Sequence, residues 1–129
     1  MKKKVLIVDD EADMRTYFES LLSENGFETA TASDGDIGFE MARTFQPDVI
    51  TLDIIMERET GVKFYRKVLK DDCLKNTPVI ILSGVGSYKA LFGRDHATMT
   101  KPFAFLEKPV DTDELIDKIN EAIALKEKV

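Results

Sequence analysis

The stretch 49-VITLDIIME-57 places one carboxylate, Asp53, inside a run of Val, Ile, Thr, Leu and Met. A short apolar run rich in β-branched residues predicts a buried β-strand. A buried acid is normally paired, bound to a metal or neutralised by a shifted pKa, because an unpaired buried carboxylate is costly. We therefore expect other parts of the chain to supply groups that compensate for the charge of Asp53.

Four other segments share the strand pattern. Two of them, VLIV at 5–8 and VIIL at 79–82, are continuously apolar, whereas FETATA at 27–32 and FAFLE at 103–107 are mixed. Strands inside a parallel sheet are covered on both faces and are therefore almost entirely apolar. The mixed segments are thus expected at the edges of the sheet, and the apolar ones at its centre.

Helical segments alternate with these strands. Apolar residues recur with helical spacing over 11–26, about 34–45 and about 59–70, and a last stripe follows Asp111 and Thr112, either of which can cap a helix. This alternation predicts right-handed crossovers and a doubly wound α/β fold. A five-stranded parallel sheet in the order 2-1-3-4-5 satisfies the sorting of apolar and mixed strands, and its site should lie at the carboxyl ends of the strands.

The apolar stripes indicate which helix faces should pack. The first helix carries the stripe Met14, Tyr17, Phe18, Leu21 and Leu22. In the second helix, Ile37, Met41 and Phe45 share one face.

Length and charge limit the class of protein. A chain of 129 residues, 43% of them hydrophobic, fits one compact domain over 1–129. The net charge of −6 argues against a nucleic-acid surface. Because Asp9 and Asp10 interrupt the first apolar run and Cys73 has no cysteine partner, the sequence favours a cytoplasmic protein with no membrane segment.

Polar residues of useful chemistry follow the predicted strands. Asp9 and Asp10 follow the first, Asp53 the third, Ser83 the fourth and Lys108 the fifth. Converging carboxylates repel one another, and an all-oxygen ligand set favours Mg²⁺. A lysine and a hydroxyl beside them suit a small oxyanion, so the pattern predicts phosphoryl transfer onto Asp53.

Each of these features also has an ordinary structural explanation. The acids at 9–13 could simply form the first turn of a helix, where the positive end of the helix dipole stabilises negative charge. Ser83 before Gly84 is a common way to end a strand, and Lys108 before Pro109 could be a solvated charge at a turn. The combination is specific because each residue falls at the expected end of its strand.

The chain resembles the receiver domains of two-component response regulators from about Lys4 to Lys126. The resemblance rests on VLIVDDE, PDVITLDIIM followed by Gly61, PVIILSG and FLEKPVDTDEL. It implies Asp53 as the phosphoacceptor and Mg²⁺ held by Asp9, Asp10, Asp53 and the backbone carbonyl of Ile55. It also implies that Ser83 and Lys108 contact the phosphoryl group, and that Phe105 is an aromatic switch altering the face of helix 4, strand 5 and helix 5.

The sequence departs from the family pattern in two places. Glu57 stands where receivers usually have Pro, and both Lys101-Pro102 and Lys108-Pro109 resemble the lysine motif. Lys108 fits better because FLE predicts a strand directly before it. With Lys108 as the motif lysine, the connection between the fourth and fifth strands is longer than usual, which predicts a short or irregular fourth helix. The same connection contains the local basic cluster Lys89, Arg94, His96 and Lys101.

The resemblance also implies partners. We expect a stand-alone receiver, with no output domain, that takes its phosphoryl group from a histidine kinase or histidine phosphotransfer domain and contacts a downstream protein. It would be a monomer or a phosphorylation-dependent dimer, and it would catalyse only its own modification.

The alternative function is a phosphate-independent interaction module. An aspartyl-phosphate phosphatase is disfavoured because Ile55 stands where those enzymes place a second acid, and an FMN site is excluded because DDEAD would meet the anionic phosphate.

Overall fold

The computed structural model describes residues 2–54, 56, 60–84 and 102–127. Its five strands pair in parallel in the order β2-β1-β3-β4-β5, so the predicted doubly wound α/β fold and strand order are confirmed. The mixed strands β2 and β5 lie at the two edges. The strands are β1 Lys4–Val8, β2 Glu28–Ala32, β3 Val49–Asp53, β4 Val79–Ser83 and β5 Ala104–Glu107, and the helices are α1 Ala12–Glu24, α2 Gly35–Phe45, α3 Thr60–Lys70 and α5 Thr112–Glu127.

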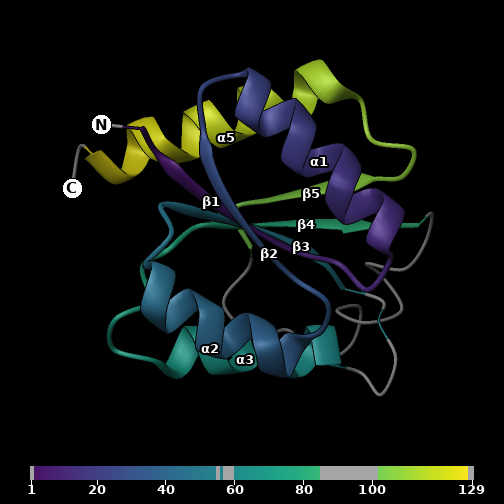
Figure 1. Ribbon diagram of the computed structural model, residues 1–129. Helices are drawn as coiled ribbons and strands as arrows, with labels where there is room; N and C mark the ends of the chain where they lie inside the picture. The colour runs from purple at the N-terminus through teal and green to yellow at the C-terminus, as the bar shows by residue number, and fades with distance from the viewer. Residues whose placement is uncertain (1, 55, 57–59, 85–101, 128–129) are drawn as a thin grey trace.

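The sheet is covered by helices on both faces. Figure 1 shows α1 and α5 above the sheet and α2 and α3 below it. Side chains alternate between two apolar clusters, since Val5 and Ile7 join the cluster under α1 and α5 while Leu6 and Val8 join the one under α2 and α3. The central strands are therefore packed between two apolar cores, one on each face of the sheet. This packing also fixes the position of the carboxyl ends of those strands.

The packing face of α2 matches the predicted stripe only in part. Ile37 is 47% exposed, and the buried centre of the helix consists of Gly38 and Ala42. A Cβ at Gly38 would meet atoms of Phe64 and Val8 at 3.2 Å, which means that α2 approaches its neighbours closely. Of the predicted stripe, Met41 and Phe45 do pack against the core cluster, whereas Ile37 does not. In α1, Tyr17 likewise lies outside the buried face, at 49% exposure.

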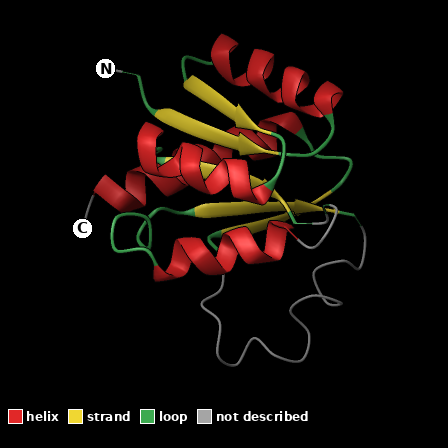
Figure 2. Cartoon of the chain, turned by 60° about the horizontal axis from the view of Figure 1, so that its bottom comes forward, coloured by secondary structure: helices red, strands yellow, loops and turns green. Residues whose placement is uncertain are grey.

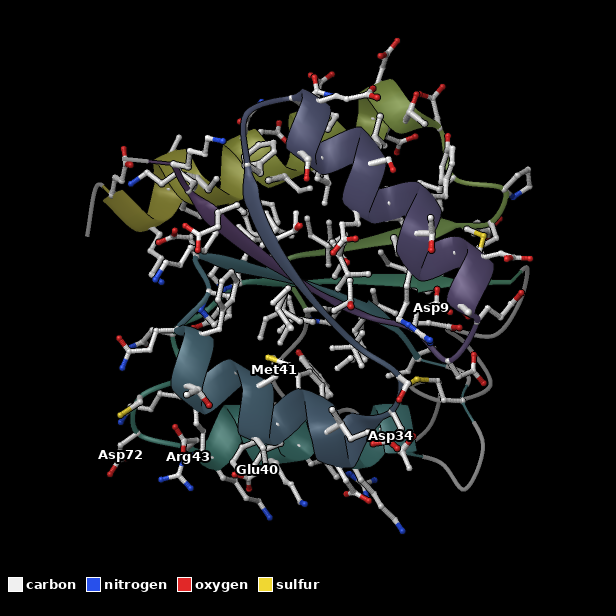
Figure 3. The ribbon with its side chains drawn as sticks, in the orientation of Figure 1. Asp9, Asp34, Glu40, Met41, Arg43 and Asp72 are labelled. Carbon is white, nitrogen blue, oxygen red and sulfur yellow. The ribbon has the colours of Figure 1, made fainter. Side chains whose placement is uncertain are left out.

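The carboxyl ends of the strands all lie at one edge, because every pairing is parallel. Figure 3 places Asp9 and Asp34, which follow β1 and β2, toward one end of the molecule and Asp72, which precedes β4, toward the other. The two chain ends lie together, as Figures 1 and 2 show, on the side away from the Asp9 labelled in Figure 3, and Lys3 Nζ lies 2.7 Å from Glu127 Oε1. Within the described ranges, no helix combines the length and the apolar run needed to cross a bilayer.

Candidate functional site

Four carboxylates gather at the carboxyl edge of the sheet. Asp9, Asp10 and Glu11 follow β1, Asp53 ends β3, and one ligand oxygen of each lies within 4.8 Å of the others. Asp9 and Asp53 are buried, whereas Asp10 and Glu11 are exposed. The structure thus brings the three predicted acids together, and it adds Glu11, which the sequence analysis treated only as part of an acidic helix start.

Lys108 brings a positive charge to this group. Its Nζ lies 3.4 Å from Asp53 Oδ2 and 3.9 Å from Asp9 Oδ2. The lysine reaches this position because its backbone N–H donates to the carbonyl of Ser83 at 2.7 Å, directly after β5. Lys108 therefore contacts acids from two central strands, across a sequence separation of 55 residues from Asp53.

Asp9 is the most buried of the four acids, at 1% exposure. Its Oδ1 accepts the backbone N–H of Glu11 at 2.9 Å, and its buried Oδ2 accepts no hydrogen bond from the described residues. Burial raises the pKa of Asp9 above 3.8, while the Glu11 N–H and the Lys108 charge act in the opposite direction and the neighbouring acids Asp10 and Glu11 add to the rise. Asp9 is thus a carboxylate with one oxygen bonded to the backbone and the other left available.

The turn from β1 into α1 is held by hydrogen bonds to its backbone atoms, from the main chain and from the Arg15 side chain. Asp9 N–H donates to Ala32 O at 3.1 Å, and Arg15 Nη1 donates to the Asp9 carbonyl at 2.8 Å. Glu11, the N-cap residue of α1, makes no side-chain capping bond. The turn is thus held without a capping bond from the Glu11 carboxylate.

The end of β3 is held by the start of α3. A Cβ at Gly61 would collide with the carbonyl oxygen of Ile54 and approach that of Asp53 at 3.0 Å. Any larger residue would have to push α3 away from the chain beside Asp53. Gly61 thus allows the close approach that fixes the backbone next to this acid.

Ser83 and Phe105 belong to the same face of the sheet. Phe105 pairs with Ile81, and Ser83 lies two residues beyond Ile81, so the alternation of side chains places Ser83 and Phe105 on one side. Ser83 is fully buried, and its hydroxyl has no hydrogen-bond partner within the described segments. Phe105 is partly buried against the cluster under α2 and α3. A buried hydroxyl without a partner is a group that a ligand at this edge could satisfy.

The donor set fits Mg²⁺. The four carboxylates set against the cations Lys108 and Arg15 leave a formal charge of −2, which one divalent cation would neutralise. Among the described residues, the side-chain ligands gathered here are carboxylate oxygens, which Mg²⁺ prefers, and none of these residues donates a hydrogen bond to the buried Asp9 Oδ2. The residues present therefore suit a hard divalent ion.

Several sequence predictions lie outside the described residues. They concern the carbonyl of Ile55, the acid Glu57, the short or irregular fourth helix and the basic cluster Lys89, Arg94, His96 and Lys101. Arg15, which lies one helical turn after Glu11, was not among the predicted site residues.

Fold and site together define a doubly wound α/β protein that gathers acids and a lysine at the carboxyl ends of its central strands. The chain belongs to the response regulator receiver domain family, whose sequence profile matches residues 5–120. It is 29% identical over 121 residues to the chemotaxis protein CheY of Thermotoga maritima, covering 93% of this chain and 97% of that one. A crystal structure of a response regulator receiver domain protein from Clostridium thermocellum superimposes with a TM-score of 0.84 at 31% identity, covering 97% of each chain.

Other relatives are longer proteins. The chain is 38% identical over 128 residues to a protein-glutamate methylesterase/protein-glutamine glutaminase of Methanococcus maripaludis, covering 95% of this chain but 33% of that protein. The chain thus spans about a third of the length of the first curated relatives it matches, at 32% and 33%. What it shares with those relatives is the receiver domain.

Proposed function

We propose that the protein is a phosphoacceptor of a two-component phosphorelay and that Asp53 receives the phosphoryl group. The observation that carries this proposal is the position of Lys108 Nζ, 3.4 Å from Asp53 Oδ2, beside a buried pair of acids at the carboxyl edge of the sheet. A carboxylate in such a place can act as a nucleophile, and a fixed lysine can neutralise charge on an incoming phosphoryl oxygen. A histidine kinase or histidine phosphotransfer domain would be the donor.

In the proposed transfer step, this chain contributes Asp53, Lys108 and Ser83. An oxygen of Asp53 forms a bond to phosphorus as the donor's P–N bond breaks, and the leaving imidazole keeps the electron pair and takes a proton from solvent. Lys108 holds a positive charge beside the transferred group, and the Ser83 hydroxyl donates a hydrogen bond to it. The product is an aspartyl phosphate, so the only reaction proposed is the protein's own modification and its hydrolytic reversal.

Asp9, Asp10, Asp53 and the backbone carbonyl of Ile55 would hold Mg²⁺, with Glu11 close to the same group. When bound, the ion supplies positive charge that neutralises the phosphoryl oxygens. The contribution of the chain is to keep the acids converging, since Asp9 is fixed through Glu11 N–H and Asp53 ends a central strand. Asp10, which is exposed, then contributes a ligand from the open side.

The output of the modification is proposed to be a change of surface. Ser83 and Phe105 share one face of the sheet, so movement of Ser83 toward a phosphoryl group leaves space for the Phe105 ring to turn inward. This would alter the face that includes β5 and α5, where a downstream protein would bind. We propose a cytoplasmic setting, protein contacts in place of direct nucleic-acid binding, and a monomer or a phosphorylation-dependent dimer.

Mass spectrometry tests the phosphoacceptor. Wild-type protein incubated with Mg²⁺ and acetyl phosphate should gain the mass of one phosphoryl group, and Asp53→Ala should gain none. Asp36→Ala is the matched control, because Asp36 lies in the first turn of α2 and outside the group of four acids. No mass gain in wild type would favour the phosphate-independent interaction module, and a gain in Asp53→Ala would assign the acceptor to another residue.

A further inference from the structure

Arg15 of α1 bonds to both ends of the turn that carries the first three acids. Its backbone N–H donates to the carbonyl of Glu11 at 3.0 Å, and its Nη1 donates to the carbonyl of Asp9 at 2.8 Å. One residue therefore fixes the distance across the turn Asp9–Glu11. The bond from the guanidinium is partly buried and charge-assisted, and such bonds are stronger than those between neutral groups.

This turn needs such a bond more than an ordinary helix start does. Three consecutive acids repel one another and Asp53, with ligand oxygens within 4.8 Å, and the N-cap residue Glu11 makes no side-chain bond to the helix. Arg15 is the only basic residue in the sequence of α1. Without its side chain, the carbonyl of Asp9 would lose its guanidinium donor, and the repulsion between the acids would act on a looser loop.

The position and the charge of Arg15 have opposite consequences for a cation at this site. A guanidinium repels Mg²⁺, so charge alone predicts tighter binding when Arg15 is removed. A residue that holds the ligand-bearing turn predicts weaker binding, because the ligands are no longer kept converging. These opposite signs allow one measurement to decide between the two effects.

We propose that Arg15 is a positioning residue, which holds the turn Asp9–Glu11 in the arrangement that metal binding and phosphoryl acceptance require, and that this role outweighs its repulsion of the cation. The inference rests on the proposed function for the metal site. The proposed site thereby includes, beyond its ligands, a residue whose bonds in the structure go to the carbonyls of Asp9 and Glu11.

The first test is a Mg²⁺ titration followed by amide chemical shifts, without a phosphodonor. Arg15→Met keeps the stem and removes the donor and the charge, and we expect the dissociation constant to rise about 10-fold, as for loss of a group that orients a metal ligand. Arg15→Lys keeps a cationic donor and should recover most of that loss. Arg43→Met, which removes a 59% exposed arginine from α2, is the control for net charge and should bind Mg²⁺ as wild type does.

A second measurement does not require the metal. In EDTA, the amide hydrogen of Glu11, which is bonded to Asp9 Oδ1 at 2.9 Å, should exchange faster in Arg15→Met than in wild type and Arg15→Lys. Core amides and the unfolding midpoint should stay unchanged, which separates a local role from general destabilisation. Equal or tighter Mg²⁺ binding by Arg15→Met, or unchanged exchange at Glu11, would overturn the role of Arg15. Failure of wild type to bind Mg²⁺ would instead overturn the proposed metal site, and the exchange data would still show whether Arg15 holds the turn.

Discussion

The start of α1 and the starts of α2 and α5 use acidic residues in opposite ways. At α2, Asp34 Oδ1 accepts the N–H of Ile37 at 2.8 Å, and before α5, Asp111 Oδ1 accepts the N–H of Glu114 at 3.1 Å. Both are ordinary N-caps. At α1, Glu11 makes no such bond, and its carboxylate lies with those of Asp9, Asp10 and Asp53.

The difference shows how structural acids can be separated from chemical ones. A carboxylate that bonds to the first turn of its helix stabilises that helix. A carboxylate at a helix start that makes no hydrogen bond to the N–H groups of the helix remains available to bind a ligand. Asp9 combines the two uses, since one oxygen accepts the Glu11 N–H and the other lies 3.9 Å from Lys108. Substitutions at the two kinds of helix start should therefore have opposite effects on chemistry and stability.

The largest expected effect is on chemistry, at the start of α1. Asp10→Asn should slow phosphorylation by acetyl phosphate at least about 100-fold, because it removes a proposed metal ligand and not merely its orienting partner. The unfolding midpoint in EDTA should stay equal or rise, since one of four mutually repelling carboxylates becomes neutral. Asp13→Asn, in the first turn of the same helix but outside the group of four, should phosphorylate normally. Equal rates for both variants would remove Asp10 from the site.

An intermediate effect, on stability, is expected at the start of α2. Asp34→Ala removes the cap of Ile37 N–H and should lower the free energy of unfolding by about 1 kcal/mol. Its rate of phosphorylation should stay close to that of wild type. Chemical denaturation measures the first quantity and mass spectrometry the second. Asp36→Ala, which loses only an exposed contact with Lys67 at 3.7 Å, should be destabilised less. A loss of phosphorylation in Asp34→Ala would show that the acid at the start of α2 also serves the chemistry, so that the start of α1 is not distinct in this respect.

The smallest expected effect is that of Asp9→Asn on the thermal stability of the protein. It is small because the Glu11 N–H and the Lys108 charge offset part of the cost of burying the Asp9 carboxylate. The folded protein holds the Asp9 proton more tightly than the unfolded chain does, since burial raises this pKa above 3.8. In EDTA, the contribution of Asp9 to stability therefore falls as pH rises from 3.8 through the raised pKa. Asp9→Asn should thus unfold at a higher temperature than wild type at neutral pH, with a difference that shrinks toward pH 3.8. A thermal melt series that shows the reverse order would contradict this assignment.

Much of the fold could be predicted because its determinants are periodic and local. The apolar runs of β1, β3 and β4 identified the central strands, and the mixed β2 and β5 identified the edges. The face of α2 could be predicted only in part, since Met41 and Phe45 pack against the core but Ile37 does not. Its packing depends on Gly38 and Ala42, whose small size matters only once α3 is known to lie against the helix.

The candidate site was predictable where a residue type and a strand end coincide. Asp9, Asp10, Asp53 and Lys108 followed from that rule, and the structure brings them together. Arg15 and Glu11 did not follow from it. The role proposed for Arg15 rests on a bond to a backbone carbonyl, and every residue carries such a carbonyl, so no pattern of side chains indicates that contact. Glu11 is also typical of any helix start, and only the missing cap distinguishes it.

The parallel sheet has a consequence for the order of events during folding. Asp9 follows β1, Asp53 ends β3 and Lys108 follows β5, and Lys108 is placed through its backbone bond to Ser83 of β4. None of these contacts is local, so the group of charges cannot assemble until the edge strand β5 has paired. A nascent or partly unfolded chain would hold its acids together without their lysine. Only molecules in which β5 has paired would then accept a phosphoryl group. The fraction of the protein that acetyl phosphate modifies would therefore measure the fraction that is completely folded.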